Sequence, residues 1–242
     1  MSDSHHASIP QNVGDWIIVA LLPLVLLTTS IRLEMNSPAL YTRGFETYDV
    51  ASATGIDEEQ LDAIVTLLID YFNSRAASPQ MQATTNDGAS FPLYHDYEII
   101  HLADVKGLFD INSVLQSAGL LILVCLVSLA LAHSRRRAVL HGLQRGAILT
   151  LGGLVVAGVL FATSFGDMFV SFHLLLFDNP FWQLDPRTDY LVKLFPYHFW
   201  QDMFMLAGGI TATFSLVVLG IARFGLKRGP GDGPWQRSAG EP

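Results

Sequence analysis

Four of the eight histidines fall in two segments that link strongly apolar stretches, and these are His95, His101, His173 and His198. Imidazole takes up and releases protons near neutral pH, which suits it to general acid–base catalysis. If both segments lie on one side of a membrane, the four imidazoles reach the same face. We therefore expect an acid–base site on that face.

The stretch from Asp96 to Lys106 places two carboxylates around one of these histidines. In a helix, Glu98, His101 and Asp104 are three residues apart and share one face, so a carboxylate can orient the imidazole and raise its basicity. Ordinary charge pairs on a surface helix have the same spacing. The spacing alone leaves both interpretations open.

His173 directly follows an apolar run and lies at its boundary, where a histidine can also extend its ring to the interface without any catalytic role. Asp167 lies six residues earlier, inside the run. An unpaired charge there costs about 2.5–3.5 kcal/mol on insertion scales, so we expect Asp167 to be paired or near the interface.

Aromatic side chains are concentrated in the same region, since thirteen of the 26 lie between Phe161 and Phe204. A belt of aromatic residues at the membrane interface explains part of this. So many aromatic residues in one connecting segment also predict an aromatic-walled pocket for lipid.

The composition indicates which elements must position these residues. Half of the chain is hydrophobic and only 15% is charged, against about 25% charged in average globular domains. The net charge of −8 has the wrong sign for nucleic-acid binding. Cys125 is the only cysteine, so no intrachain disulfide or cysteine-based metal cluster is possible.

Four apolar stretches are long enough, or nearly so, to cross a bilayer as helices: 16–31, 114–132, 147–170 and 203–222. We read the first as a retained helix, because no basic residue precedes it and no cleavage site follows it. The fold class is therefore an α-helical integral membrane protein with four transmembrane helices and an extracytoplasmic cap of mixed helix and short strands.

Basic residues set the expected orientation, since Lys and Arg accumulate in short cytoplasmic segments. They are dense in the loop 133–146 and in the tail 223–242, which places these segments and the tail 1–15 in the cytoplasm. The cap 32–113 and the second extracytoplasmic loop 171–202 then face outward. We expect a multi-pass protein of the cytoplasmic membrane with both termini cytoplasmic.

Two further patterns concern packing. Apolar residues from Leu61 to Phe72 recur at helical spacing after an acidic first turn, which predicts an amphipathic cap helix. Gly153 with Ala157, and Gly208 with Ala212, form small-xxx-small pairs typical of close helix packing in membranes.

Taken together, the two outer segments resemble the bacterial lipoprotein intramolecular transacylase family. The resemblance covers the four-helix layout and two motifs, one from Glu98 to Lys106 and one that begins at Phe172 and ends at Phe199. It implies an acyltransferase that moves the sn-2 acyl chain of a diacylglyceryl lipoprotein to the α-amino group of its N-terminal cysteine, which gives the lyso form. It implies diacylated lipoproteins as partners, and neither a cofactor nor a metal.

The family's two catalytic histidines correspond to His101 and His173. We expect His101 to be the base, oriented by Glu98 or Asp104, and His173 to stabilise the oxyanion or transfer a proton, although the two roles can be exchanged. The resemblance makes Glu98, Asp104, Lys106, Asn179 and Asp189 supporting residues. The substrate pocket is expected to be lined by the aromatic residues Phe172, Phe177, Trp182, Phe195 and Phe199.

Two alternatives from other classes remain. A metal-dependent membrane hydrolase would use the four outer histidines with Asp104 or Asp178 as ligands. It predicts bound zinc or another transition metal, and loss of activity with a chelator. A non-enzymatic envelope protein would bind a partner through the acidic cap. The sequence does not give the oligomeric state.

Overall fold

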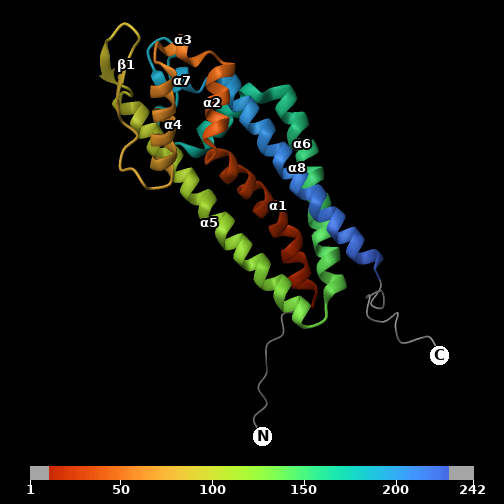
Figure 1. Cartoon of the computed structure of the whole chain (residues 1–242). Coiled ribbons are helices and arrows are strands. Elements are labelled where there is room, and N and C mark those ends of the chain that lie inside the picture. The colour runs from red at the N-terminus through yellow and green to blue at the C-terminus, as the bar shows by residue number, and fades with distance from the viewer. Residues whose placement is uncertain (1–10, 229–242) are drawn as a thin grey trace, which may run out of the picture. The chain divides into compact units, whose positions relative to one another are not determined.

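Four long helices dominate the computed structural model, which describes residues 11–228 (Figure 1). They are α1 (Gln11–Met35), α5 (Asp96–Ala132), α6 (Arg136–Leu176) and α8 (Tyr197–Lys227). All four are long and apolar enough to cross a membrane. The predicted fold class is confirmed. The predicted tails 1–15 and 223–242 lie largely outside the described residues.

The helices are longer than the apolar stretches that predict them. The helix that contains 114–132 already begins at Asp96, and the one that contains 147–170 runs from Arg136 to Leu176. Hydropathy detects only the part of a helix that suits hydrocarbon, whereas the backbone hydrogen bonds continue through its polar ends. The motif from Glu98 to Lys106 therefore lies on a continuous helix.

The chain divides into two compact units, and the described part of the first consists of residues 11–27, 115–156 and 209–228. Its α1 and α6 segments approach closely at two glycines. A Cβ added to Gly142 would lie 3.2 Å from Ile18, and one added to Gly146 would lie 3.0 Å from Leu22. Small residues permit this approach. The glycines predicted for this role are the wrong ones, because no described residue lies within 4 Å of a Cβ added to Gly153 or Gly208.

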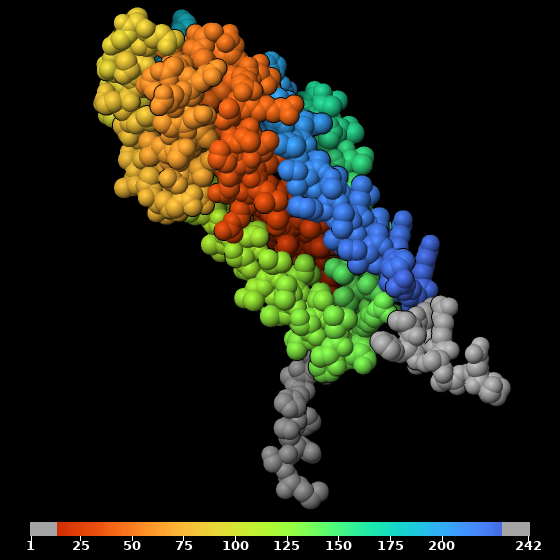
Figure 2. All heavy atoms as spheres, viewed as in Figure 1, coloured from red at the N-terminus to blue at the C-terminus, as the bar shows by residue number. Residues whose placement is uncertain are grey.

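The second unit, Thr28–Val114 with Ala157–Gly208, contains the short elements. These are α2 (Pro38–Thr47), α3 (Val50–Thr54), α4 (Glu58–Phe72), β1 (Gln82–Thr84), β2 (Ser90–Pro92) and α7 (Tyr190–Leu194). The two strands pair antiparallel, with Ala83 opposite Phe91. Figure 2 shows the orange α2–α4 segments beside the yellow hairpin segment. Mixed helix and short strands were predicted here.

The amphipathic helix α4 forms for the expected reasons. The Asp57 side chain accepts a hydrogen bond from the Gln60 backbone N–H at 2.9 Å, and Glu58 and Glu59 follow in the first turn, where the helix dipole favours negative charge. The apolar face is buried, including Leu61, Ile64 and Leu68.

The core of this unit is rich in aromatic residues. Phe199 is 2% exposed, and its ring lies 5.2 Å from that of Phe195 and 6.1 Å from that of Tyr41. Gly44 of α2 faces Phe199 so closely that an added Cβ would lie 2.6 Å from the ring. Phe195 and Phe199 thus fill the hydrophobic core, which differs from the predicted place in the substrate pocket.

Candidate active site

Two buried histidines from different helices lie side by side in the second unit. His101 is on the second turn of α5 and is 7% exposed, while His173 is near the end of α6 and is 8% exposed. The centroids of the two rings are 5.9 Å apart. Helix α6 is bent at Ser164, where the backbone leaves the helical region, so the segment that carries His173 has its own direction. The predicted pair is therefore brought together.

Aromatic rings surround the two imidazoles. Phe177 meets His101 edge-on at 5.1 Å and His173 at 5.4 Å between ring centroids. The ring of Trp182 lies 4.8 Å from that of His173, and the ring of Phe169 lies 4.3 Å from it. Phe172 touches both His173 and Phe177. Of the predicted pocket residues, Phe172, Phe177 and Trp182 lie at the histidines.

The two imidazoles differ in what their Nδ1 atoms contact. The Nδ1 of His173 lies 2.6 Å from the backbone carbonyl oxygen of Phe169. A carbonyl oxygen only accepts hydrogen bonds, so this Nδ1 carries the proton and the Nε2 of the neutral ring carries the lone pair. The Nδ1 of His101 is buried and has no hydrogen-bond partner among residues 11–228.

A polar contact fixes the loop after α6 to α5. The Asn179 side chain donates a hydrogen bond to Asp104 at 2.8 Å and accepts one from the Phe181 backbone N–H at 3.1 Å. Because Phe177 and Trp182 flank Asn179 in the chain, this contact positions two walls of the histidine site. In the structure, Asp104 therefore accepts a hydrogen bond from the loop after α6.

Glu98 is fully buried, and its contacts correct the prediction that it orients His101. Its carboxylate accepts hydrogen bonds from the backbone N–H and Nδ1 of His95 at 2.7 and 2.9 Å, and from the backbone N–H of Leu191 at 2.8 Å. Glu98 and His101 are three residues apart on the same helix face, but the Glu98 carboxylate points to α7. There it accepts a hydrogen bond from a backbone N–H in the first turn of that helix. Glu98 therefore connects α7 to the start of α5.

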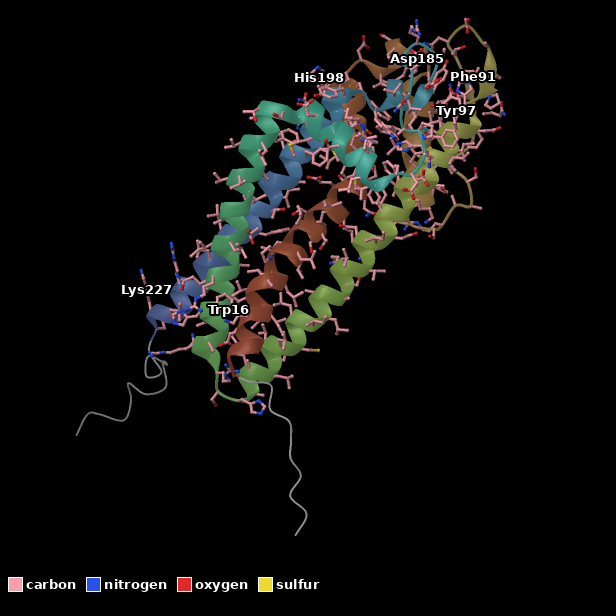
Figure 3. The ribbon with its side chains drawn as sticks, turned by 180° about the vertical axis from the view of Figure 1, so that it is seen from behind. Trp16, Phe91, Tyr97, Asp185, His198 and Lys227 are labelled. Carbon is pink, nitrogen blue, oxygen red and sulfur yellow. The ribbon has the colours of Figure 1, made fainter. Side chains whose placement is uncertain are left out.

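Asp189 strengthens the same connection. It is 3% exposed and accepts hydrogen bonds from the hydroxyls of Tyr97 at 2.6 Å and Thr188 at 2.7 Å, and from the Asp185 backbone N–H at 2.7 Å. Tyr97 and Asp185 lie near each other in Figure 3. Burial disfavours the ionised carboxylate, but the hydrogen bonds outweigh it and hold the pKa of Asp189 below its usual range.

We expect Asp189→Asn to destabilise the protein by about 1–3 kcal/mol at neutral pH, because hydrogen bonds to a buried carboxylate are lost. A depressed pKa contributes stability that is present above the unfolded value, about 3.9, and disappears as the pH falls through the folded value. The difference between wild type and variant should therefore shrink below about pH 4.

Thermal unfolding in detergent across this pH range measures the effect. Asp178→Asn, which changes an exposed acid in the same loop, is the matched control and should match wild type. An Asp189→Asn difference that stays constant down to the lowest pH would contradict this account.

The other predicted residues lie elsewhere. Lys106 donates a hydrogen bond to Ser74 at 2.6 Å and pairs with Asp110 at 3.7 Å. His95 pairs with Glu98, and the Nδ1 of the exposed His198 lies 2.6 Å from the side-chain oxygen of Gln201. The four outer histidines therefore do not form one cluster. Within residues 11–228, no group of three or more His, Cys, Asp or Glu side chains is arranged to hold a metal ion.

Sequence reasoning missed Phe169 and Tyr97. Phe169 supplies both an aromatic wall and the carbonyl that orients His173, and its position four residues before His173 in a helix was the available signal. Tyr97 contacts a residue 92 positions away, and no local pattern indicates such a pair.

Comparison of the sequence and the structure with known proteins identifies a matching family and similar solved structures. The sequence profile of the family described as lipoprotein intramolecular transacylase Lit matches residues 16–200. No curated protein sequence gives a match. A solved structure of the membrane integral lipoprotein intramolecular transacylase Lit from Bacillus cereus aligns with a TM-score of 0.76 at 18% identity, covering 90% of this chain and 96% of that one.

Two variants of that enzyme, each with one histidine replaced, also align. The variant with arginine at that histidine gives a TM-score of 0.72 at 17% identity and covers 90% of this chain and 92% of that one. The variant with alanine gives 0.72 at 17% identity, with 90% and 94% covered. At these identities the structures show a shared fold.

Proposed function

Because the chain belongs to the lipoprotein intramolecular transacylase family, we propose that its substrate is a diacylated lipoprotein and that His101 and His173 catalyse the acyl transfer. The protein is a multi-pass membrane enzyme that acts on lipoproteins. In the proposed reaction, the sn-2 acyl chain moves from the glycerol oxygen to the α-amino group of the N-terminal cysteine. The observation that carries this proposal is the buried pair of imidazoles, 5.9 Å apart within aromatic walls.

His173 is suited to be the general base. Its Nδ1–H is held by the Phe169 carbonyl, which leaves Nε2 as a proton acceptor. The α-ammonium of a peptide has a pKa of about 7.7–8.0, so it must lose a proton before the nitrogen attacks. A neutral imidazole with a fixed tautomer can take up that proton and pass it to solvent, and it is then ready for the second proton that the nitrogen loses during the attack. This assignment exchanges the roles expected from sequence.

His101 is suited to stabilise the oxyanion. Its buried Nδ1 has no hydrogen-bond partner in the described part of the chain. An unprotonated nitrogen at this place avoids an unpaired N–H in the interior. The proton then lies on Nε2, which becomes a donor for the negative oxygen of the tetrahedral intermediate. No carboxylate contact is needed for this role.

The proposed step is balanced without an acyl-enzyme, water or cofactor. Once the proton of the α-ammonium has been passed to solvent, the neutral amine nitrogen attacks the ester carbonyl carbon. His173 then takes the second proton, which the nitrogen loses as the new bond forms. When the intermediate collapses, the bond between the carbonyl carbon and the glycerol oxygen breaks. His173 then returns the proton to that oxygen, so an amide and a free glycerol hydroxyl are formed.

The aromatic walls support the intramolecular course of the reaction. Phe177, at 8% exposure, and Trp182 leave little room for water beside the imidazoles. An enclosure of this kind favours the folded substrate conformer in which the amine reaches the ester, and it converts an improbable ring closure into a proximity effect. Exclusion of water also suppresses hydrolysis of the ester.

We further propose that the enzyme lies in the cytoplasmic membrane with both termini in the cytoplasm. The first unit supports this orientation, since its described part contains seven Arg and Lys residues and a single acid, Asp15. The histidine site would then face outward, where the N-terminal cysteine of an anchored lipoprotein is displayed.

The proposal is tested with a diacylated reporter lipoprotein and the purified enzyme in bilayers. Fragmentation mass spectrometry of the N-terminal lipopeptide locates each acyl chain. We expect one chain to move to nitrogen at unchanged total mass. The His101→Ala/His173→Ala double variant should leave both acyl chains on the glycerol. Loss of a fatty acid from the reporter would instead indicate a hydrolase, the alternative class, and would contradict the proposal.

A further inference from the structure

A groove of about 240 Å³ opens in the first unit between the start of α1 and the start of α6. It is lined by residues from both helices: Asp15, Trp16, Val19, Ala138, His141, Gly142 and Arg145. The four α6 residues have the spacing of a single helix face. No step of acyl transfer uses this groove.

The groove combines a cationic side with an apolar side. Arg145 and His141 are exposed on α6, and Trp16 of α1 is 63% exposed. The acid that reaches the groove is already paired, because both oxygens of Asp15 lie 3.2 Å from the Arg135 guanidinium. Arg145 therefore adds a positive charge beside the exposed indole.

The position of the groove along the helices corresponds to the level of lipid headgroups. The two spanning helices begin at Gly14 and Arg136, and the apolar stretch of the second begins at 147. Trp16 therefore lies in the first turn of one helix, and Arg145 lies just before the apolar stretch of the other. Tryptophan prefers the membrane interface, and basic pockets between membrane helices suit anionic headgroups. Figure 3 labels Trp16 and Lys227 at this end of the first unit.

We propose that this groove binds the headgroup of an anionic glycerophospholipid, with its phosphate at Arg145 and its glycerol and upper acyl chain against Trp16 and Val19. A lipid fits better than a soluble phosphate, because the exposed indole and the adjoining helix faces are apolar. The surrounding charge agrees, since Asp15 is the only acid in the described part of this unit.

The test uses the full chain in nanodiscs of phosphatidylglycerol or phosphatidylcholine whose acyl chains are brominated near the glycerol. Bromine quenches nearby indoles, and subtraction of Trp16→Phe isolates the Trp16 signal. We expect brominated phosphatidylglycerol, diluted in unlabelled lipid, to quench Trp16 at lower mole fractions than brominated phosphatidylcholine. Arg145→Ala should reduce this preference about fivefold, as loss of one basic residue near anionic lipid predicts.

Arg137→Ala is the matched control, because Arg137 is an exposed arginine of α6 outside the groove, and it should keep most of the preference. Arg145→Lys keeps the positive charge and should retain the lipid preference. It provides a second test of Arg145 in case Arg145→Ala does not fold. Equal quenching by the two lipids would overturn the proposal, and so would an equal loss in both alanine variants. Competition by excess inorganic phosphate would indicate a soluble anion and would also overturn it.

Discussion

His173→Ala and His101→Ala each lower the rate of N-acylation by about 10²–10⁴-fold, the range that a positioned acid or base contributes. The two imidazoles act on one proton and one oxyanion, so the double variant should lose little more than the worse single variant. The measurement is a time course of reporter conversion followed by mass spectrometry. Effects of the single variants that multiply in the double variant would indicate two independent sites.

Glutamine variants separate the two roles. The glutamine amide can donate a hydrogen bond near the Nε2 position but cannot serve as a base at neutral pH. His101→Gln should therefore recover part of the activity that His101→Ala loses, whereas His173→Gln should recover none. Rescue at His173 alone would reverse the assignment made from the Phe169 contact.

Phe199→Ala lowers the free energy of unfolding by about 3–5 kcal/mol, which is typical of a large aromatic residue removed from a core. Phe199 is 2% exposed and packs against Tyr41, Phe195 and the Gly44 backbone. Gly44 leaves no side chain that can fill the cavity. Chemical unfolding in detergent, followed by circular dichroism, measures the loss.

The same variant distinguishes a core residue from a pocket residue. Because the nearest rings of Phe199 belong to the cap core, the folded fraction of Phe199→Ala should keep its rate per molecule, and Phe199→Leu should recover much of the stability. Phe177→Ala should lose rate, since Phe177 touches both imidazoles. A rate lost at Phe199 in fully folded protein would return this residue to the substrate pocket.

The sequence predicts the four apolar helices and helix α4, because hydropathy and 3.6-residue periodicity are local properties. The pairing of His101 with His173 came from family resemblance, since α5 and α6 bring together residues 72 positions apart in the chain. The hydrogen-bond partners of Glu98 could not be predicted from the sequence for the same reason. One of them is the backbone of Leu191, 93 positions away.

Aromatic residues show the same limit on a smaller scale. Phe177 and Phe195 belong to one aromatic-rich segment, yet one contacts the imidazoles and the other fills the cap core beside Phe45. Composition predicts that such rings will be buried, but it does not predict which residues they will contact. The hydrogen bonds of Asn179 and Asp189 hold this segment to α5, and they thereby determine which ring contacts which neighbour.

Intramolecular acyl transfer is tested most directly by a crossover experiment. Two diacylated reporters, distinguished by peptide sequence and with deuterated acyl chains on only one, are mixed with the enzyme in one bilayer. The account predicts that every N-acyl chain carries the label of the peptide to which it was originally attached. N-acylated peptides bearing the other reporter's label would contradict it and would show that the acyl group passes between molecules.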